Sequence, residues 1–96
     1  MILEWSRFAL ADRDEIFDYI ERDNPRAAIA MDDLIGAQVS LLATFPRTGR
    51  IGRVVGTREL VITRTPYLAV YRVLGDTVRV LRVLHGSRRW PEEMPP

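Results

Sequence analysis

The 96-residue chain contains no cysteine and no lysine, and it has one histidine. Without cysteine there can be no disulfide, thiolate zinc site, iron–sulfur cluster or cysteine nucleophile. One histidine excludes a site of several histidines in a single chain, and the sequence predicts neither a metal nor a cofactor. No apolar run reaches the roughly 18–20 residues that a membrane-spanning helix needs. The start also lacks the basic and long apolar regions of a signal peptide, so we expect a cytoplasmic protein with no membrane partner.

The composition is that of one small folded domain. Hydrophobic residues make up 47% of the chain and charged residues 28%, which is too apolar for a disordered polymer. A chain of this length buries about 60–65% of the surface that its unfolded form exposes, so we expect modest stability and a binding partner. We expect a single domain over residues 1–96, with residues 91–96 as a flexible tail.

The net charge of +1 conceals two oppositely charged halves. Residues 1–45 hold nine acidic residues and four arginines, a net charge of −5. Residues 46–90 hold ten arginines and two acidic residues, a net charge of +8. Guanidinium groups bind phosphates and carboxylates through two parallel hydrogen bonds. One explanation of the arginine excess is the codon usage of a G+C-rich genome. Even so, because the guanidinium groups are concentrated in one half, we expect that half to bind an anionic partner: nucleic acid, an acidic peptide, or both.

The first half of the chain predicts a strand and two helices. Residues 2–5 form a short apolar strand, and Ser6 can cap a helix that ends near Asp23. Asn24 and Pro25 interrupt that helix, and Pro25 suits the first position of a second helix that runs to Pro46. Because the connection is so short, the two helices must form an antiparallel hairpin. The apolar positions expected to face the core are Phe8, Leu10, Ile16, Phe17 and Ile20 in the first helix and Ala27, Met31, Leu34, Ile35, Leu41, Leu42 and Phe45 in the second.

The second half predicts a glycine-rich loop over residues 46–56 and three strands over residues 58–63, 67–73 and 77–84. The short turn at residues 74–76 makes the last two strands a hairpin. The fold class is therefore α+β: an N-terminal strand, an antiparallel helix hairpin, and a three-stranded antiparallel meander that forms one curved sheet backed by the helices. Apolar residues occur on both faces of the last strand. We therefore expect a groove, a partner or the tail on the face away from the helices.

The residues with the most chemical potential follow the last predicted strand. Arg82, His85, Arg88, Arg89 and Trp90 place three guanidinium groups, one imidazole and one indole within nine residues. Such a cluster can bind a backbone phosphate, stabilise charge during phosphodiester cleavage, or bind an acidic peptide. The alternative is that His85, at a strand end, is a structural hydrogen-bonding residue.

Two other groups of side chains have simpler interpretations. The acidic residues of the first helix, from Asp12 to Glu21, are expected to form a solvated face, because no rigid loop or third ligand accompanies them. Tyr67 and Tyr71 lie four residues apart in a strand and therefore on one face. Packing is the expected role of both, and base stacking is the alternative.

Several stretches of the sequence resemble the RelE/ParE toxin superfamily over about residues 3–91. The resemblance implies the toxin of a type II toxin–antitoxin module, with two helices against a curved antiparallel sheet. It also implies a cognate antitoxin as partner, and contact with operator DNA only through that antitoxin. The stretches that carry the resemblance are residues 4–6, 11–20, 24–28, 57–60, 66–73, 80–85 and 88–91.

The resemblance implies two competing activities. RelE-like members cut mRNA on the ribosome, and ParE-like members inhibit DNA gyrase. Where the nucleases carry basic residues, this chain has Glu59, Val61 and Leu68, none of which can donate to a phosphate. A tyrosine used by the nucleases falls near Met94. The comparison favours the ParE-like activity.

The resemblance also yields candidate site residues for each activity. If the chain is a ribosome-dependent mRNA endonuclease, its catalytic residues are Arg82, His85 and Arg88. If it is a ParE-like inhibitor, its target is DNA gyrase and no hydrolysis is involved. A third possibility is a toxin-derived binding module that has lost toxicity and acts with its antitoxin on operator DNA. The residues expected to bind the target or another anion are Arg58, Arg64, Arg82, Arg88, Arg89 and Trp90.

Overall fold

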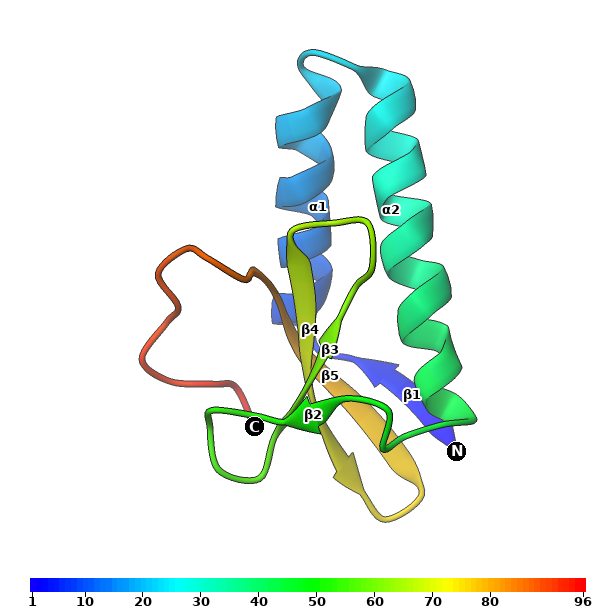
Figure 1. Ribbon diagram of the computed structural model, residues 1–96, viewed down its shortest axis with the longest axis vertical. Coiled ribbons are helices and arrows are strands. Elements are labelled where there is room, and N and C mark those ends of the chain that lie inside the picture. The colour runs from blue at the N-terminus through cyan, green and yellow to red at the C-terminus, as the bar shows by residue number, and fades with distance from the viewer.

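Two helices pack side by side on one face of a five-stranded sheet in the computed structural model, which describes residues 1–96 (Figure 1). The predicted α+β class and the order of strand, helix hairpin and strands are confirmed. The helices are α1 (Arg7–Glu21) and α2 (Pro25–Ser40). The strands are β1 (Ile2–Trp5), β2 (Arg50–Ile51), β3 (Arg58–Val61), β4 (Tyr67–Leu74) and β5 (Thr77–His85).

The sheet is mixed, with the strand order β1-β5-β4-β3-β2. The predicted meander of β3, β4 and β5 is antiparallel and forms its centre. β1 lies along β5 in parallel, with Leu3 opposite Val78. This pairing was not predicted from the sequence. The prediction of a continuous loop over residues 46–56 is partly wrong, because Arg50 and Ile51 form a short edge strand against β3. Two residues are too few to produce a readable alternation of apolar and polar side chains.

Both helices begin where the sequence predicts. The Ser6 side chain accepts a hydrogen bond from the Ala9 backbone N–H at 3.0 Å, and the Asn24 side chain accepts one from the Ala27 N–H at 3.1 Å. These bonds satisfy N–H groups that have no partner inside a helix. The predicted end of the second helix is wrong: α2 ends at Ser40, and the tighter turn η1 (Leu41–Ala43) follows.

The main core lies between the hairpin and the sheet. Phe8 and Leu10, predicted to face the core, are exposed, and Ala9 between them is fully buried. A small side chain at this position allows α1 to pack closely against the sheet. Past the end of α2, Leu42 is buried, whereas Leu41 and Phe45 are exposed. The core residues are Ala9, Ile35, Val39, Leu42, Ile62, Ala69, Tyr71, Val78, Val80 and Val83.

A β-bulge in β5 explains the apolar residues on both faces of that strand. Opposite the neighbouring residues Val70 and Tyr71 of β4 stand Arg82 and Val80, so Leu81 is the extra residue. The bulge reverses the alternation of side chains in the second half of the strand. Val83 therefore joins Val80 in the main core, and Leu81 packs on the opposite face of the sheet.

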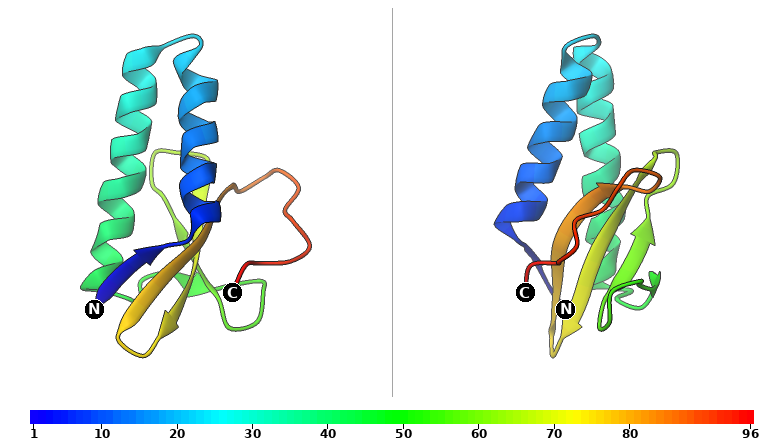
Figure 2. Two further views of the ribbon diagram at one scale, coloured as in Figure 1. Left: turned by 180° about the vertical axis from the view of Figure 1, so that it is seen from behind. Right: turned by 90° about the vertical axis from the view of Figure 1, so that its left-hand side faces the viewer.

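The C-terminal residues cover part of that opposite face. Leu68, Val70 and Leu81 form a small buried cluster, against which Trp90 and Met94 pack. The segment after β5 leaves the end of the strand and returns along the sheet (Figure 2). At its end, the Arg79 side chain donates a hydrogen bond to the Pro96 carbonyl at 2.9 Å. The flexibility of residues 91–96 stays a prediction.

The helix hairpin extends beyond the sheet, so that the turn between α1 and α2 is exposed (Figure 1). Arg13 joins the elements at the base of the hairpin. Its Nε atom lies 2.9 Å from Asp32 Oδ1 of α2, and its guanidinium carbon lies 4.7 Å from the centre of the Trp5 ring. Neither helix combines the length and the apolar character that crossing a lipid bilayer requires.

Candidate functional site

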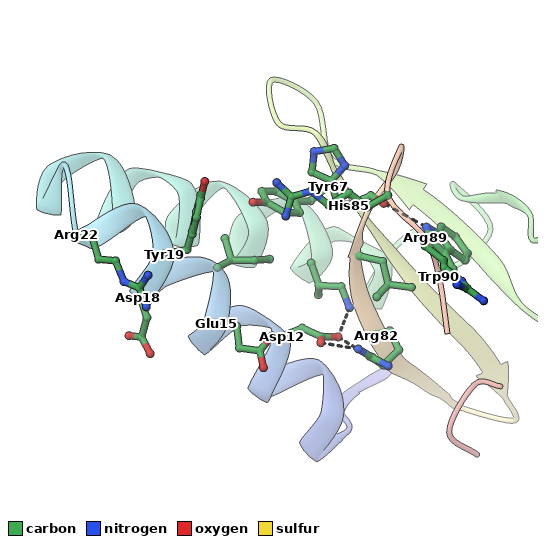
Figure 3. A pocket seen from close by; sticks show the side chains of 14 residues that line it. Asp12, Glu15, Asp18, Tyr19, Arg22, Tyr67, Arg82, His85, Arg89 and Trp90 are labelled. Carbon is green, nitrogen blue, oxygen red and sulfur yellow. Dashed lines mark hydrogen bonds and ion pairs between the residues drawn. The ribbon is translucent and has the colours of Figure 1, made fainter. Parts of the chain in front are cut away.

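A groove of about 510 Å³ lies between α1 and the end of β5 (Figure 3). One wall comes from α1 and carries the acidic side chains of Asp12, Glu15 and Asp18. The other comes from the end of β5 and the residues after it, and it carries most of the cluster that the sequence singles out. The groove residues from this wall are Arg82, Val83, Leu84, His85, Arg88, Arg89 and Trp90.

Side chains of α1 and of its N-cap make hydrogen bonds to backbone groups at the outer edge of β5, beside the groove. β1 ends at Trp5, opposite Val80, so beyond that point β5 has a neighbouring strand, β4, on its other side only. The Ser6 hydroxyl donates to the Leu81 carbonyl at 2.7 Å, and Asp12 Oδ2 accepts from the Val83 N–H at 2.9 Å. Two polar side chains of the helix thus replace the hydrogen bonds of an edge strand.

Asp12 also holds the guanidinium group of Arg82. Arg82 Nε lies 2.7 Å from Asp12 Oδ2, and a terminal nitrogen of Arg82 lies 2.8 Å from Asp12 Oδ1 (Figure 3). Hydrogen bonding to Asp12 raises the pKa of Arg82 above its ordinary value, so the ion pair is maintained. The prediction that Asp12 belongs to a solvated face is wrong, because its side chain is buried. The charge of Arg82 is therefore neutralised within the chain.

His85 is held on two sides. Its Nδ1 atom accepts a hydrogen bond from the Ser87 backbone N–H at 3.2 Å, so we assign the proton of the neutral ring to Nε2. The ring packs edge-on against Tyr67, with a centroid distance of 5.7 Å and an angle of 86° between the planes. Nε2 makes no hydrogen bond within the chain. Tyr67 and Tyr71 both contact the main core, so their expected packing role is confirmed.

Most arginines of the basic half are bound within the chain. Arg50 and Arg53 pair with Glu59, Arg79 pairs with Glu4, and Arg82 pairs with Asp12. Arg58 donates to the Gly49 carbonyl before β2, and Arg72 donates to the Val55 carbonyl between β2 and β3. The predicted anion-binding set is therefore divided, because the guanidinium groups of Arg58 and Arg82 have structural partners.

The remaining arginines of this half are exposed and make no ion pair or side-chain hydrogen bond. They are Arg47, Arg64, Arg88 and Arg89. Arg64 lies in the turn between β3 and β4 with a φ of 67°, a left-handed conformation that is rare for any residue except glycine. Arg88 and Arg89 follow β5, and the Gly86 N–H donates to the Pro66 carbonyl of that same turn at 2.9 Å. Arg64, Arg88 and Arg89 thus lie at one end of the sheet.

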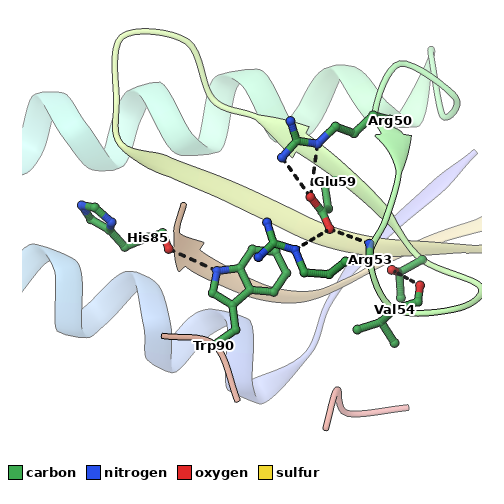
Figure 4. A network of polar contacts seen from close by, with 7 residues as sticks. Arg50, Arg53, Val54, Glu59, His85 and Trp90 are labelled. Carbon is green, nitrogen blue, oxygen red and sulfur yellow. Dashed lines mark hydrogen bonds and ion pairs between the residues drawn. The ribbon is translucent and has the colours of Figure 1, made fainter. Parts of the chain in front are cut away.

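Glu59 is the centre of a buried polar network on the opposite face of the sheet (Figure 4). Its side chain is 3% exposed. Burial alone raises the pKa of Glu59, but the hydrogen bonds from the Arg53 backbone and from the Arg50 and Arg53 side chains outweigh it and lower the pKa below 4.5. From the sequence, Glu59 was interpreted only as a residue that cannot donate to a phosphate. The missed signal is one of only two acidic residues in a half of the chain that holds ten arginines.

Tyr71 orders the loop between η1 and β2. Its hydroxyl donates to the Pro46 carbonyl at 2.7 Å and accepts from the Gly49 N–H at 2.9 Å. Burial raises the pKa of Tyr71 above 10.0, and the hydrogen bond from Gly49 opposes that rise only in part. Gly49 is required at this point, because a Cβ atom there would lie 2.6 Å from the tyrosine hydroxyl oxygen.

The strand, helix hairpin and meander, with an arginine-rich groove at the end of β5, define the class of small RelE/ParE toxin domains. The sequence profile described as the ParE toxin of the type II toxin–antitoxin system, parDE, matches residues 3–90. The chain belongs to this family. It is thus a toxin of a type II toxin–antitoxin system, and its partner is a cognate antitoxin.

Similar proteins agree with this assignment over nearly the whole chain. Y4kP of Sinorhizobium fredii is 43% identical over 90 residues, covering 94% of this chain and 93% of Y4kP. Toxin RelE2 of Caulobacter vibrioides is 36% identical over 84 residues, covering 88% of this chain and 93% of RelE2. A chain of the chromosomal ParDE TA system from P. aeruginosa superimposes with a TM-score of 0.80 and is 35% identical, over 86% of this chain and 92% of that one.

Proposed function

We propose that this chain is a ParE-like toxin, which inhibits growth by binding DNA gyrase and is neutralised by its antitoxin. The observation that carries the proposal is the engagement of Arg82 by Asp12 through two hydrogen bonds of 2.7 and 2.8 Å. A nuclease needs donors that are free to bind the scissile phosphate as its charge develops. A guanidinium group already bound to a buried carboxylate is a poor candidate for that role.

The charges around the groove support the same choice. On the α1 wall Asp12 is already paired with Arg82. The two carboxylates of Glu15 and Asp18 outnumber the one cation, Arg22, so this wall would repel the phosphates of an mRNA strand. On the opposite face of the sheet, Glu59 is committed to two arginines. A protein target can supply positive and negative groups that match both walls of the groove, whereas a nucleic acid backbone supplies negative charge alone.

Three side chains of the predicted set remain free for target binding: Arg64, Arg88 and Arg89. They are exposed and unpaired, whereas Trp90 is half-buried, with its ring on Arg53 and its N–H on the His85 carbonyl. Arginine is one of the residue types that most often dominate binding energy at protein interfaces. This set supports a carboxylate-bearing surface of the target as the ligand.

The test uses the purified chain, DNA gyrase and relaxed plasmid. We expect the chain to block supercoiling, its cognate antitoxin to restore it, and the double substitution Arg88→Ala with Arg89→Ala to weaken the block at least about tenfold. Glu92→Ala with Glu93→Ala, which changes exposed acidic residues nearby, is the matched control. Full supercoiling at saturating toxin would refute the proposal.

The second candidate is a ribosome-dependent mRNA endonuclease. The free Nε2 of His85 favours it, because His85 lines the groove together with Arg88 and its ring could exchange a proton with a reacting group. Translation of a defined mRNA with added toxin distinguishes the two functions. Cuts at specific codons that disappear in a His85→Gln variant, with no effect on gyrase, would establish the nuclease.

A further inference from the structure

Trp90 is attached to two separate parts of the fold. Its Nε1–H donates to the carbonyl of His85, the last residue of β5, at 3.2 Å. Its ring stacks on the guanidinium group of Arg53, whose central carbon lies 3.4 Å from the ring centroid (Figure 4). Arg53 belongs to the loop between β2 and β3, far from Trp90 in the sequence. The tail is therefore held at Trp90 by a cation–π contact and by a hydrogen bond.

Glu59 fixes the orientation of the Arg53 guanidinium group. Glu59 Oε2 accepts from the Arg53 backbone N–H at 2.8 Å and from Arg53 Nε at 3.3 Å. Glu59 Oε1 is occupied by Arg50, at 3.0 and 3.2 Å. The carboxylate thus holds the Arg53 group by its edge, while Trp90 covers its face. Arg50 shares the carboxylate, but it has no cation–π contact with Trp90.

The contacts of Trp90 fix the C-terminal end of the segment that contains Arg88 and Arg89. At its beginning, His85 ends β5 and the Gly86 N–H is bonded to Pro66. At its other end stands Trp90. A segment of four residues tied at both ends samples few conformations, so binding through Arg88 and Arg89 requires little further ordering.

We propose that Arg53 and Glu59 are positioning residues for target binding, acting through Trp90 on Arg88 and Arg89. The inference rests on the proposed role of those two arginines, but it does not depend on whether the target is gyrase. Arg53 and Glu59 themselves are not required to touch the target. Their contribution is to present the two cations in one arrangement.

The first measurement is the fluorescence of Trp90 in a Trp5→Phe background, where it is the sole indole. We expect Arg53→Ala to raise quenching by acrylamide several-fold, since the stacked guanidinium shields the ring. Arg50→Ala is the matched control, because it removes an arginine from the same carboxylate and leaves the stack in place. Equal quenching in the two variants would overturn the proposal.

The second measurement is the amount of toxin per cell that halves the growth rate. We expect Arg53→Ala to raise this amount at least about tenfold and Arg50→Ala to change it less than about twofold. The double variant of Arg53→Ala and Trp90→Ala should be no weaker than Trp90→Ala alone, since both changes release the same segment. Arg50→Ala should instead add independently to Trp90→Ala. Additive effects of Arg53→Ala and Trp90→Ala would overturn the proposal.

Two controls distinguish a failure of this inference from misfolding of a variant and from a failure of the proposed function. Arg53→Lys keeps a positive charge beside Glu59 and over the indole of Trp90. It should therefore recover part of the potency that Arg53→Ala loses. Growth arrest that survives Arg88→Ala with Arg89→Ala would refute the proposed use of those arginines and, with it, this inference. Inhibition of a target other than gyrase would refute only the proposed target, because the quenching and growth comparisons keep their meaning.

Discussion

The Glu59 carboxylate holds several groups of the basic half in place. It is buried, and it accepts hydrogen bonds from two guanidinium groups and one backbone N–H. Burying a carboxylate is unfavourable unless such partners replace the lost water. At the residue scale, the basic half is therefore organised by its few acidic residues as well as by its arginines.

The lowered pKa of Glu59 predicts how stability depends on pH. A carboxyl group with a folded-state pKa below its unfolded value of 4.5 stabilises the fold fully above that value and loses this contribution as the pH falls through the folded value. We expect Glu59→Gln to lower the free energy of unfolding by roughly 1–3 kcal/mol at neutral pH. The difference from the native chain should shrink below about pH 4.5.

Urea unfolding between about pH 7 and about pH 3 measures this difference. Glu92→Gln is the matched control, because that exposed residue has no partner, and it should behave like the native chain throughout. A constant difference between Glu59→Gln and the native chain at every pH would show that the loss comes from packing alone.

At the scale of elements, the contact between α1 and β5 decides the shape of the groove. β1 pairs with only the first part of β5, and the α1 cap Ser6 and the α1 residue Asp12 bond to the rest of that edge. The same carboxylate neutralises Arg82. The helix thereby completes the sheet and removes one arginine from the exposed cationic set.

We expect Asp12→Ala to lower the free energy of unfolding by about 2–4 kcal/mol, because it leaves the Val83 N–H and the Arg82 guanidinium without acceptors. Asp14→Ala, an exposed position on the same helix, is the matched control and should change stability by less than about 0.5 kcal/mol. Denaturant unfolding measures both. Equal effects of the two substitutions would show that the β5 edge does not depend on Asp12.

At the scale of the whole molecule, many large apolar side chains remain on the surface. They include Ile29, Leu41, Phe45, Ile51 and Val55, from the hairpin, the turn after it, β2 and the loop between β2 and β3. A domain of this length cannot cover them with its own chain. We expect the cognate antitoxin to cover apolar surface of the hairpin and part of the exposed sheet face.

This expectation is tested by melting the toxin with and without its antitoxin. Binding at about 1,000 times the dissociation constant adds about 4 kcal/mol, which corresponds to an increase in Tm of roughly 15–30 °C for a domain of this size. An antitoxin from an unrelated module is the control and should leave Tm unchanged. No increase with a saturating cognate antitoxin would contradict the prediction.

The sequence predicted which helices and strands form better than it predicted where they end and which of their side chains face the core. Ser6, Asn24 and Pro25 act locally, through hydrogen bonds and backbone geometry within a few residues, so both helix starts were correct. The end of α2 was wrong because the apolar pattern continues through Leu42, although the backbone tightens after Ser40. The same limit explains Phe8 and Leu10, since periodicity cannot tell which side of a helix packs against the sheet.

The sequence predicted that charged side chains cluster around the end of the last strand, but it did not predict which arginine is paired with which partner. The sequence by itself determined that the arginines concentrate in the second half, that the helix hairpin precedes a meander, and that the chain resembles a toxin family. Only the tertiary structure decided that Arg82 is neutralised by Asp12, that Arg53 is held between Glu59 and Trp90, and that Arg64, Arg88 and Arg89 stay unpaired. The physical reason is that composition and local spacing are properties of neighbouring residues, whereas the partner of a charge depends on which distant segments the fold brings within hydrogen-bond distance.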